Sequence, residues 1–465
     1  MIDKKSKKNI VFTNIGMTNQ NVNRAEGMLR LSYRTFIISM LLTLIIYYTF
    51  PYVKMSAGGF LVYSSIVALV GFLSILLIRY FGILITSFLF VTKYTLTQTK
   101  DYNPFVSIIV PVYNEATIIQ DSIKSLLQLN YNNYEIIIVN DGSSDDTIEK
   151  CNQLVGVHSG INSKVMVSLI NKPNGGKASA LNTGIQFSKA DFVLCMDGDT
   201  HIDPNTLKFS MRHFKNEKLG AVAGNVKILN RNKILTDLQS LEYIEGLNML
   251  RSSQSYLGII NIIPGPVGIF RKSAIIQAGW YSNDTFAEDA DLTLKLRIAG
   301  WEVIYEMNAI GYTEAPESIY QLLKQRYRWT RGILQSIRKY KRFLYNPFLN
   351  FSSSVILWSM FYEAIVWPTM NIFAHLFFMS VAIIFGMSSL IPLWWAIIAV
   401  LDIISAIYCI AVEAEELRLI PYAIIYRIFF IFLIDITKAA ATIEEFLGMR
   451  MTWSKLDRIG TLKSN

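Results

Sequence analysis

The chain has 465 residues, of which 52% are hydrophobic and only 17% are charged. Soluble domains carry about 25% charged residues, so this composition excludes a wholly soluble chain and a disordered one. Basic residues exceed acidic ones by 44 − 35 = 9, which suits anionic lipid headgroups or phosphate-bearing ligands. The three cysteines are far apart in the sequence, which argues against a disulfide framework or a zinc site. No nucleic-acid motif is present, so nucleic acid is not an expected partner.

Two apolar regions flank a more polar centre. Residues 1–34 form a basic cytoplasmic tail, and 35–92 predict two membrane-spanning helices. Their apolar runs, 35–53 and 58–78, each have about the 20 residues that cross a bilayer, and a short interfacial extension follows at 81–91. Residues 351–445 predict an interfacial helix and about three further spans, and 446–465 form a second basic tail.

The distribution of lysine and arginine predicts the topology. The positive-inside rule puts the first tail and the central domain in the cytoplasm of a multi-pass protein of the plasma or inner membrane. Three C-terminal spans would leave the basic second tail outside, which that rule disfavours. The number of C-terminal spans and the side of the C-terminus therefore stay open.

The central region, residues 93–350, alternates predicted strands and helices. Apolar runs suited to buried parallel strands occur at 106–112, 135–139, 164–170 and 192–196. Helical periodicity follows most of these runs, which predicts βαβ units. The fold class is therefore α/β, a doubly wound and mostly parallel sheet inserted between transmembrane helices.

Polar side chains gather where these strands end. Ligands of open α/β sheets bind at the carboxyl ends of the strands, so we expect a ligand site made by Glu115, Asp141, Lys177, Asp197 and Asp199. The carboxylates of Asp197 and Asp199 flank a glycine and suit Mg²⁺ or Mn²⁺, which often shares its ligands with a diphosphate. Lys177 follows two glycines at a helix start, where phosphates bind. A turn or a helix cap is the structural alternative for either motif alone.

Two further motifs lie later in the chain. Asp289 belongs to an acidic cluster at a predicted helix start and is the candidate general base; an ordinary helix cap is the alternative. Gln325, Arg328 and Trp329 form a QxxRW pattern on one helical face. Arginine can pair with a pyrophosphate and tryptophan can stack on a sugar ring, whereas a juxtamembrane anchor is the alternative.

The ordered motifs resemble a known family, the processive family 2 glycosyltransferases, which are membrane synthases of hyaluronan, cellulose, chitin and poly-N-acetylglucosamine. The resemblance rests on six segments in the family's order: VPVYNE (110–115), NDGSSDDT (140–147), NGGKASALN (174–182), DGDT (197–200), EDADL (288–292) and QRYRW (325–329). It implies a GT-A fold, a UDP-sugar donor, a growing polysaccharide as acceptor and a β-linked product. It also implies translocation of the polymer and a small auxiliary membrane subunit as partner.

The resemblance also assigns roles to individual residues. Glu115, Asp141, Lys177, Asp197 and Arg328 look like donor contacts. Asp197 and Asp199 look like the metal ligands, Asp289 looks like the inverting base, and Gln325 and Trp329 look like acceptor contacts.

The sugar and the mode of action leave alternatives open. EAPES (314–318) before QRYRW is most similar to the bacterial poly-β-1,6-N-acetylglucosamine synthases, which favours UDP-N-acetylglucosamine and an exopolysaccharide of biofilms. A hyaluronan, cellulose or chitin type of synthase and a non-processive enzyme acting on a lipid carrier are the alternatives within transferases. A nucleotide-sensing transporter and an inactive scaffold of an export complex are alternatives from other classes, which the full set of acids disfavours.

Overall fold

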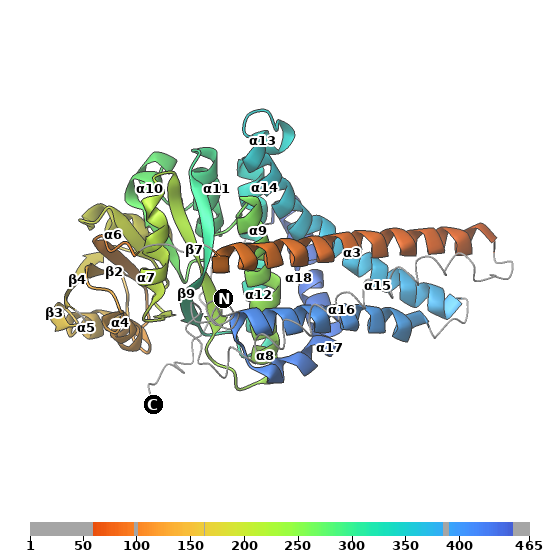
Figure 1. Ribbon diagram of the computed structural model, residues 1–465, viewed down its shortest axis with the longest axis horizontal. Helices are drawn as coiled ribbons and strands as arrows, with labels where there is room; N and C mark the ends of the chain where they lie inside the picture. Colours follow the sequence, from red (N-terminus) through yellow and green to blue (C-terminus); the bar gives the residue numbers. More distant parts are fainter. Residues whose placement is uncertain (1–58, 97–100, 162, 385–389, 450–465) are drawn as a thin grey trace, which may run out of the picture. The chain divides into compact units, whose positions relative to one another are not determined.

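The computed structural model describes residues 59–96, 101–161, 163–384 and 390–449 (Figure 1). The chain divides into two compact units. The first contains Met1–Thr97, Ile244–Ser253 and Ile365–Ala440, and the second contains Gln98–Tyr243, Gln254–Ala364 and Ala441–Asn465. The first predicted span, at 35–53, lies outside the described residues.

The second unit is built on one mixed sheet of nine strands in the order β3-β4-β2-β1-β5-β8-β7-β9-β6. The neighbours in β4-β2-β1-β5 are parallel, as are β7 and β9, and the other pairs are antiparallel. The strands are β1 (Val106–Val112), β2 (Tyr134–Asp141), β3 (Gly156–Ser159), β4 (Lys164–Lys172), β5 (Phe192–Cys195), β6 (His201–Ile202), β7 (Leu219–Ile228), β8 (Gly268–Arg271) and β9 (Glu302–Thr313).

Apolar sequence explains the central strands. Every residue of β1, β5 and β7 is buried, as expected for strands covered on both faces. The four predicted strands at 106–112, 135–139, 164–170 and 192–196 correspond to β1, β2, β4 and β5. The expected α/β sheet is thereby confirmed, but four of its eight strand pairs are antiparallel, so the sheet is mixed and not mostly parallel.

The helices of the second unit follow the strands in the expected alternation. They are α4 (Ile119–Leu127), α5 (Thr147–Asn152), α6 (Lys177–Phe187), α7 (Thr206–Met211), η2 (Arg212–Lys215), α8 (Ile234–Leu241), α10 (Lys272–Ala278), α11 (Glu288–Ile298), α12 (Ile319–Lys339), α13 (Lys341–Tyr345) and α14 (Phe351–Phe361). Two of them begin with side-chain caps, because Ser318 accepts a hydrogen bond from Gln321 N and Asn350 accepts one from Ser353 N. Apolar residues of α11, α12, α13 and α14 share one buried cluster, which holds α11 against α12.

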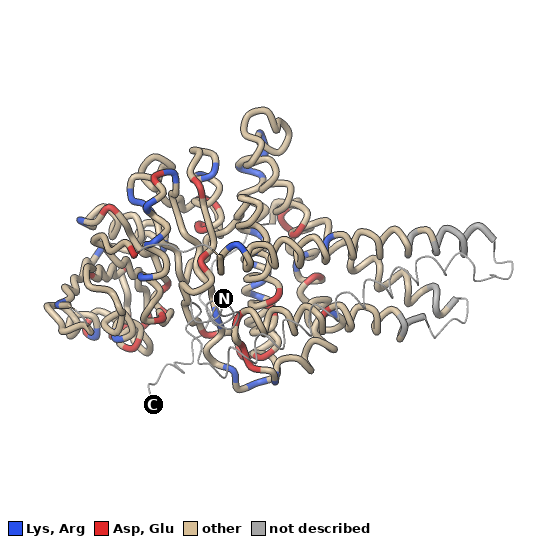
Figure 2. The backbone as a smooth tube through the Cα atoms, in the orientation of Figure 1, with Lys and Arg blue, Asp and Glu red and all other residues tan. Residues whose placement is uncertain are grey.

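The first unit is made of long apolar helices. It contains α3 (Gly59–Leu96), α15 (Trp367–Ile384), α16 (Leu390–Glu413), η5 (Leu417–Tyr422), α17 (Ala423–Ile425), η6 (Tyr426–Ile431) and most of α18 (Phe432–Phe446). The segments η3 (Glu242–Met249), α9 (Leu250–Leu257) and η4 (Tyr362–Val366) cross the boundaries of the units. Figure 2 shows few charged residues along α3, α15 and α16, in contrast to the sheet.

Three stretches of the described residues are long and apolar enough to cross a membrane: Val70–Leu96, Trp394–Glu413 and Leu417–Phe446. From Gly59 onward, the predicted run at 58–78 and its extension at 81–91 form one unbroken helix, α3. The sequence separates them at Arg79, but in the first unit this guanidinium lies over the Trp367 ring, 4.5 Å from its centroid. A cation–π contact lets the charge stay within an apolar helix.

A charged cluster inside the first unit is also paired. Arg427 Nε donates to both carboxylate oxygens of Asp402, at 2.8 and 3.0 Å, and Asp402 is fully buried. Asn371 Nδ2 donates to Asp435 at 2.7 Å. Buried charges and polar groups of this kind stay in an apolar helix bundle only when they have partners.

Candidate active site

The carboxyl ends of β1, β2 and β5 meet at one edge of the sheet. Val112 is in register with Asn140, and Ile109 is in register with Cys195. Asp141 ends β2, while Glu115 and Asp197 follow β1 and β5 after short loops. The parallel register therefore brings the predicted acids to the same edge, as the strand pattern indicated.

Glu115 lies directly against the turn that carries Asp197 and Asp199. A Cβ atom added at Gly198 would lie 2.0 Å from Glu115 Oε2 and 3.0 Å from the carbonyl oxygen of Pro111. Gly198 is therefore the residue that permits this close approach. The result is a concentration of hard oxygen atoms, which suits a divalent cation.

The cation-binding groups do not form a complete cage. Within the described residues, no group of three or more carboxylate, imidazole or thiol side chains is arranged to hold a metal ion. Two aspartates on one turn are the number of protein ligands that Mg²⁺ commonly takes when substrate phosphates supply further oxygens. The residues present thus fit a cation that binds together with a diphosphate.

Asn114 joins the first two sequence motifs. Its φ of 54° lies in the left-handed region, which asparagine tolerates better than most residues. Its Oδ1 accepts a hydrogen bond from Ser144 N at 2.8 Å, and the next residue, Glu115, donates its N–H to Thr147 Oγ1 at 2.8 Å. These bonds hold the loop of Glu115 beside the end of β2.

Asp141 binds the glycine-rich loop. Its Oδ1 accepts from Gly175 N at 3.0 Å and its Oδ2 from Gly176 N at 2.8 Å. Lys172, the last residue of β4, forms an ion pair with the same carboxylate. Asp141 is only 3% exposed, so in this structure it fixes the loop that leads into α6 and thereby places Lys177.

Lys177, the first residue of α6, bridges two acidic motifs. Its Nζ lies 2.6 Å from Asp197 Oδ1 and 2.7 Å from Glu288 Oε1. Although burial opposes the charged form, Asp197 and Glu288 raise the pKa of Lys177 well above its usual value. The ammonium group is therefore charged and links the end of β5 to the start of α11.

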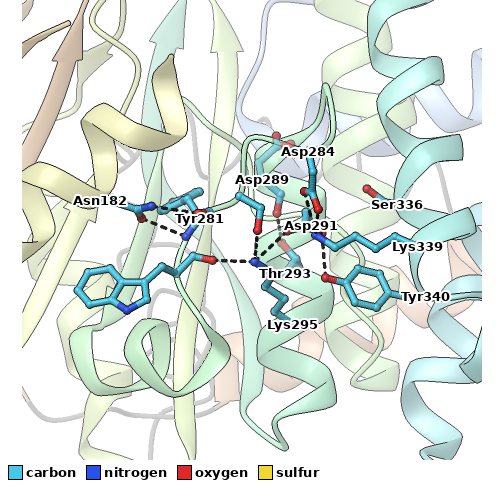
Figure 3. A network of polar contacts seen from close by, with 12 residues as sticks. Asn182, Tyr281, Asp284, Asp289, Asp291, Thr293, Lys295, Ser336, Lys339 and Tyr340 are labelled. Atoms are coloured by element: carbon cyan, nitrogen blue, oxygen red, sulfur yellow. Dashed lines mark hydrogen bonds and ion pairs between the residues drawn. The ribbon is translucent and has the colours of Figure 1, made fainter. Parts of the chain in front are cut away.

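Asp289 lies in the first turn of α11. Its Oδ1 accepts a hydrogen bond from Ala290 N at 2.8 Å. Its carbonyl oxygen accepts one from Thr293 Oγ1 at 2.7 Å (Figure 3). Burial and the neighbouring carboxylate of Glu288 raise the pKa of Asp289 to about 6, although Lys177 acts in the opposite direction. A carboxylate with such a pKa is suited to general base catalysis near neutral pH.

Lys177, Glu288 and Asp289 line one small pocket. Its free volume is ≈ 10 Å³, about the least that one ordered water needs. A Cβ atom added at Gly265 would lie 3.0 Å from Lys177 Nζ and 3.2 Å from both carboxylate oxygens of Asp197. The loop of Gly265 thus lies directly against the ion pair of Lys177 and Asp197.

The side chain of Trp329, the last residue of the QxxRW pattern, is held in place by Arg326, which the sequence pattern does not single out. Arg326 donates to Glu242 through Nε at 3.0 Å and through Nη2 at 2.6 Å. The same guanidinium lies 4.2 Å from the centroid of the Trp329 ring and donates to Gln325 Oε1. Gln325 is 7% exposed, so this amide supports the arginine at least as directly as it could contact a ligand.

Arg328 has a different environment. In the part of the chain that the structure describes, its half-buried guanidinium has neither a hydrogen bond nor an ion pair. Arg328 and Gly332 share one face of α12, because residues four apart are neighbours on a helix. A Cβ atom added at Gly332 would lie 2.6 Å from both Cβ and N of Ala287, so this face of α12 packs against the segment that precedes Asp289.

Asp291 is a second residue that the sequence analysis did not single out. It is fully buried and accepts a hydrogen bond from Tyr340 at 2.8 Å. Ion pairs at 2.7 Å to Lys339 and at 3.2 Å to Lys295 complete its surroundings (Figure 3). The third acid of the EDAD segment therefore anchors α11 to the end of α12.

The structure thus gathers Glu115, Asp197, Lys177 and Asp289 at one edge of the sheet, with Asp199 in the same turn as Asp197. Asp141 is connected to these residues by its hydrogen bonds to the glycine loop that precedes Lys177. Helix α12 is connected to them by the contact of Gly332 with Ala287, which precedes Asp289. The roles of these residues stay predictions. The main groups that sequence reasoning missed are Glu288, Asp291, Arg326 and Lys172. Glu288 and Asp291 carried a signal as neighbours of Asp289 in the acidic cluster, and Arg326 lies within the QRYRW segment.

Comparisons with known proteins agree with this arrangement. Residues 107–278 match the model of glycosyl transferase family 2. The chain is 36% identical over 245 residues to a poly-beta-1,6-N-acetyl-D-glucosamine synthase of Staphylococcus aureus (strain COL) and 40% identical over 228 residues to one of Staphylococcus epidermidis. These matches cover 52% and 49% of this chain, and 58% and 54% of the relatives, so the chain matches little more than half of each relative.

Among solved structures, a mannosyltransferase from Pyrobaculum calidifontis, in complex with GDP-Man and Mn²⁺, has a similar fold. The TM-score is 0.58 at 18% identity, and the match covers 82% of this chain and 99% of the other. Residues 107–278 thus match a glycosyltransferase family 2 domain, and the mixed sheet has a GT-A-like fold.

Proposed function

We propose that this protein is a membrane-embedded, processive and inverting glycosyltransferase that elongates a β-linked polysaccharide from UDP-N-acetylglucosamine. The observation that carries the proposal is the single pocket shared by Lys177 and Asp289, with Asp197 paired to Lys177 at the strand ends. The choice of sugar is supported by the similarity to the two staphylococcal synthases.

The donor binds at the edge of the sheet. Glu115 and Asp141 contact its nucleoside, while Lys177, Asp197 and Arg328 contact the diphosphate side. Arg328 suits this role because its guanidinium has no ion-pair partner among the described residues and a planar guanidinium binds phosphate oxygens in a bidentate manner.

Asp197 and Asp199 hold a divalent cation, either Mg²⁺ or Mn²⁺. When bound, this cation supplies positive charge that stabilises the departing diphosphate. Asp197 and Asp199 would hold this cation, and the oxygens of the donor would supply further ligands. The mannosyltransferase of similar fold was solved with Mn²⁺.

The chemical step is a single displacement. Asp289 accepts the proton of an acceptor hydroxyl while that oxygen attacks C1 of the donor sugar, and the bond from C1 to the phosphate oxygen breaks as UDP leaves. Attack opposite an α-linked leaving group gives a β linkage. The elevated pKa of Asp289 makes its carboxylate a stronger base than an exposed aspartate.

Gln325 and Trp329 hold the acceptor end of the polymer. The Trp329 ring is fixed from one side by the Arg326 guanidinium, so its position is set before a sugar arrives. Retention of the product at this ring allows repeated addition without release.

The catalytic domain faces the cytoplasm, and the apolar helices span the cell membrane several times and conduct the polymer outward. The three candidate spans support this location. The domain boundaries at 34, 92, 350 and 445 and the small auxiliary subunit stay predictions.

The test is an assay of the purified full-length chain in lipid nanodiscs. A panel of UDP-sugars is combined with Mg²⁺ or Mn²⁺, and any polymer is digested with linkage-specific hydrolases. We expect UDP release and a polymer only with UDP-N-acetylglucosamine, and neither with Asp289→Asn. Asp199→Ala should remove the cation dependence of donor binding. A polymer from another sugar, or one that Asp289→Asn still makes at a normal rate, would contradict the proposal.

A further inference from the structure

The segment that leads into α11 is held by two residues of α12. Gly332 permits contact with the backbone of Ala287, where an added Cβ would lie 2.6 Å from the Ala287 nitrogen. One turn further along α12, Gln335 Oε1 accepts a hydrogen bond from Phe286 N at 3.0 Å. Phe286 precedes Asp289 by only three residues, so this bond fixes the chain just before the proposed base.

The other end of the Gln335 amide contacts the last turn of α18. Its Nε2 donates to Glu445 Oε2 at 3.4 Å. A carboxylate can only accept hydrogen bonds, whereas an amide has one accepting and one donating end. Glu445 therefore turns the NH₂ group of Gln335 toward itself and leaves Oε1 directed at Phe286 N.

Glu445 is itself fixed by a buried arginine of α12. Arg331 Nε donates to Glu445 Oε2, and its Nη1 and Nη2 donate to Tyr327 Oη at 2.7 Å and to the carbonyl oxygen of Met449 at 2.6 Å. The side chains of Arg331 and Glu445 are only 4% and 15% exposed. The carboxylate is thus held rigidly, and its hydrogen bond to Gln335 is shielded from water.

We infer that Gln335, oriented by Glu445, is a positioning residue that sets the location of Asp289 relative to the acceptor. Neither residue reaches the reacting atoms; both act through the backbone of Phe286. The inference rests on the proposed role of Asp289 as base. Since Glu445 lies at the end of the candidate span Leu417–Phe446, the last turn of this span takes part in ordering the active site.

A reciprocal exchange tests the inference because the hydrogen-bond chain can be rebuilt with its polarity reversed. Gln335→Glu alone places two carboxylates side by side and loses the donor to Glu445. In the pair Gln335→Glu with Glu445→Gln, the carboxylate at 335 accepts from Phe286 N and from the new amide at 445. That amide oxygen still accepts from Arg331. A residue that serves only to fill space would not respond to this exchange.

The experiment measures kcat, the donor KM and the melting temperature of the full-length protein in nanodiscs, with UDP-N-acetylglucosamine and Mn²⁺. We expect Gln335→Met and Gln335→Glu to lower kcat by about tenfold to a hundredfold, the range for a misplaced catalytic group. The donor KM should change little. The exchanged pair should recover kcat to within about threefold of the parent, as coupled neighbours do. The matched control is Arg338→Met, an exposed residue of the same helix.

A normal kcat in Gln335→Met, or an exchanged pair no faster than Gln335→Glu, overturns the inference. If Gln335→Met does not fold, the comparison of Gln335→Glu with the exchanged pair decides. Asp289→Asn, measured in parallel, separates the two claims. Full turnover in that variant refutes the proposed base, whereas inactivity in that variant together with normal Gln335 variants refutes only the positioning role.

Discussion

Lys177 Nζ lies 2.6 Å from Asp197 Oδ1, so the first acid of the DGD turn is paired with a cation that belongs to the protein. The ammonium group compensates the negative charges of Asp197 and Glu288. We propose that a bound diphosphate takes over this ammonium group and leaves Asp197 to the divalent cation. The ion pair therefore balances the charge of the site in the state without ligand.

Removal of this ammonium group should strengthen cation binding without donor. We expect Lys177→Met to lower the Kd of Mn²⁺ by about tenfold, equivalent to about 1.4 kcal/mol, because Asp197 no longer has a competing partner. The donor KM should rise, since a phosphate contact is lost. Electron paramagnetic resonance of free Mn²⁺ measures the first effect directly. Lys124→Met, at a lysine whose side chain is 60% exposed, is the control; an unchanged Mn²⁺ affinity in Lys177→Met would contradict the competition.

The pH dependence of the reaction should follow Asp289. Its pKa of about 6 means that the carboxylate is deprotonated above that pH and protonated below it. A base must be deprotonated, so kcat/KM should rise tenfold per pH unit below about 6 and level off above it. Initial rates of UDP release from pH 4.5 to 8 measure this profile.

Glu288→Gln provides the matched test of that assignment. Burial is the largest cause of the raised pKa and remains in this variant, but the repulsion from Glu288 is removed. The rise of kcat/KM with pH should therefore occur at lower pH in this variant. If the rise stays at the same pH, or occurs at higher pH, another group controls the profile.

The part of the site that could be predicted from the sequence depends on local rules. Buried strands such as β1 and β5 follow from continuous apolar runs, and parallel pairing then brings Glu115 and Asp197 to one edge. Which residues pair at that edge was not predictable. Nothing in the segments around Lys177 and Glu288 indicates that these side chains meet, because the contact joins residues more than 100 positions apart and depends on the three-dimensional path.

The QRYRW segment illustrates the same limit. Its helical face was predicted, but the contacts made by its second residue, Arg326, were not. Arg326 donates to the buried carboxylate of Glu242. The same guanidinium also donates to Gln325 and lies over the Trp329 ring. A buried charge needs a partner, and the identity of that partner appears only when α12 and Glu242, the first residue of η3, are seen together.

Trp329 should matter more for elongation than for use of the donor. We expect Trp329→Ala to lower polymer formation by about tenfold, equivalent to about 1.4 kcal/mol of lost acceptor contact, while hydrolysis of the donor by water changes little. The ratio of polymerised to hydrolysed sugar, from radiolabelled donor, measures the difference. Trp358→Ala, at a half-exposed tryptophan of α14, is the control. Equal losses of both activities would contradict an acceptor role.

Gly332 should tolerate no side chain, because α12 contacts the entry to α11 at this point. An added Cβ would lie 2.6 Å from Ala287 N and 2.8 Å from the carbonyl carbon of Phe286, and backbone atoms cannot yield as a flexible side chain can. We expect Gly332→Ala to lower the free energy of unfolding by about 1–3 kcal/mol, the usual effect of overpacking, and to reduce kcat by displacing Asp289. Thermal melting and initial rates measure the two effects. Gly82→Ala is the matched control, since this helical glycine has no atom within 4 Å of an added Cβ and alanine is favoured in helices by about 1 kcal/mol. If Gly332→Ala has the same melting temperature and kcat as Gly82→Ala, the close contact between α12 and the residues that precede Asp289 does not exist in the working enzyme.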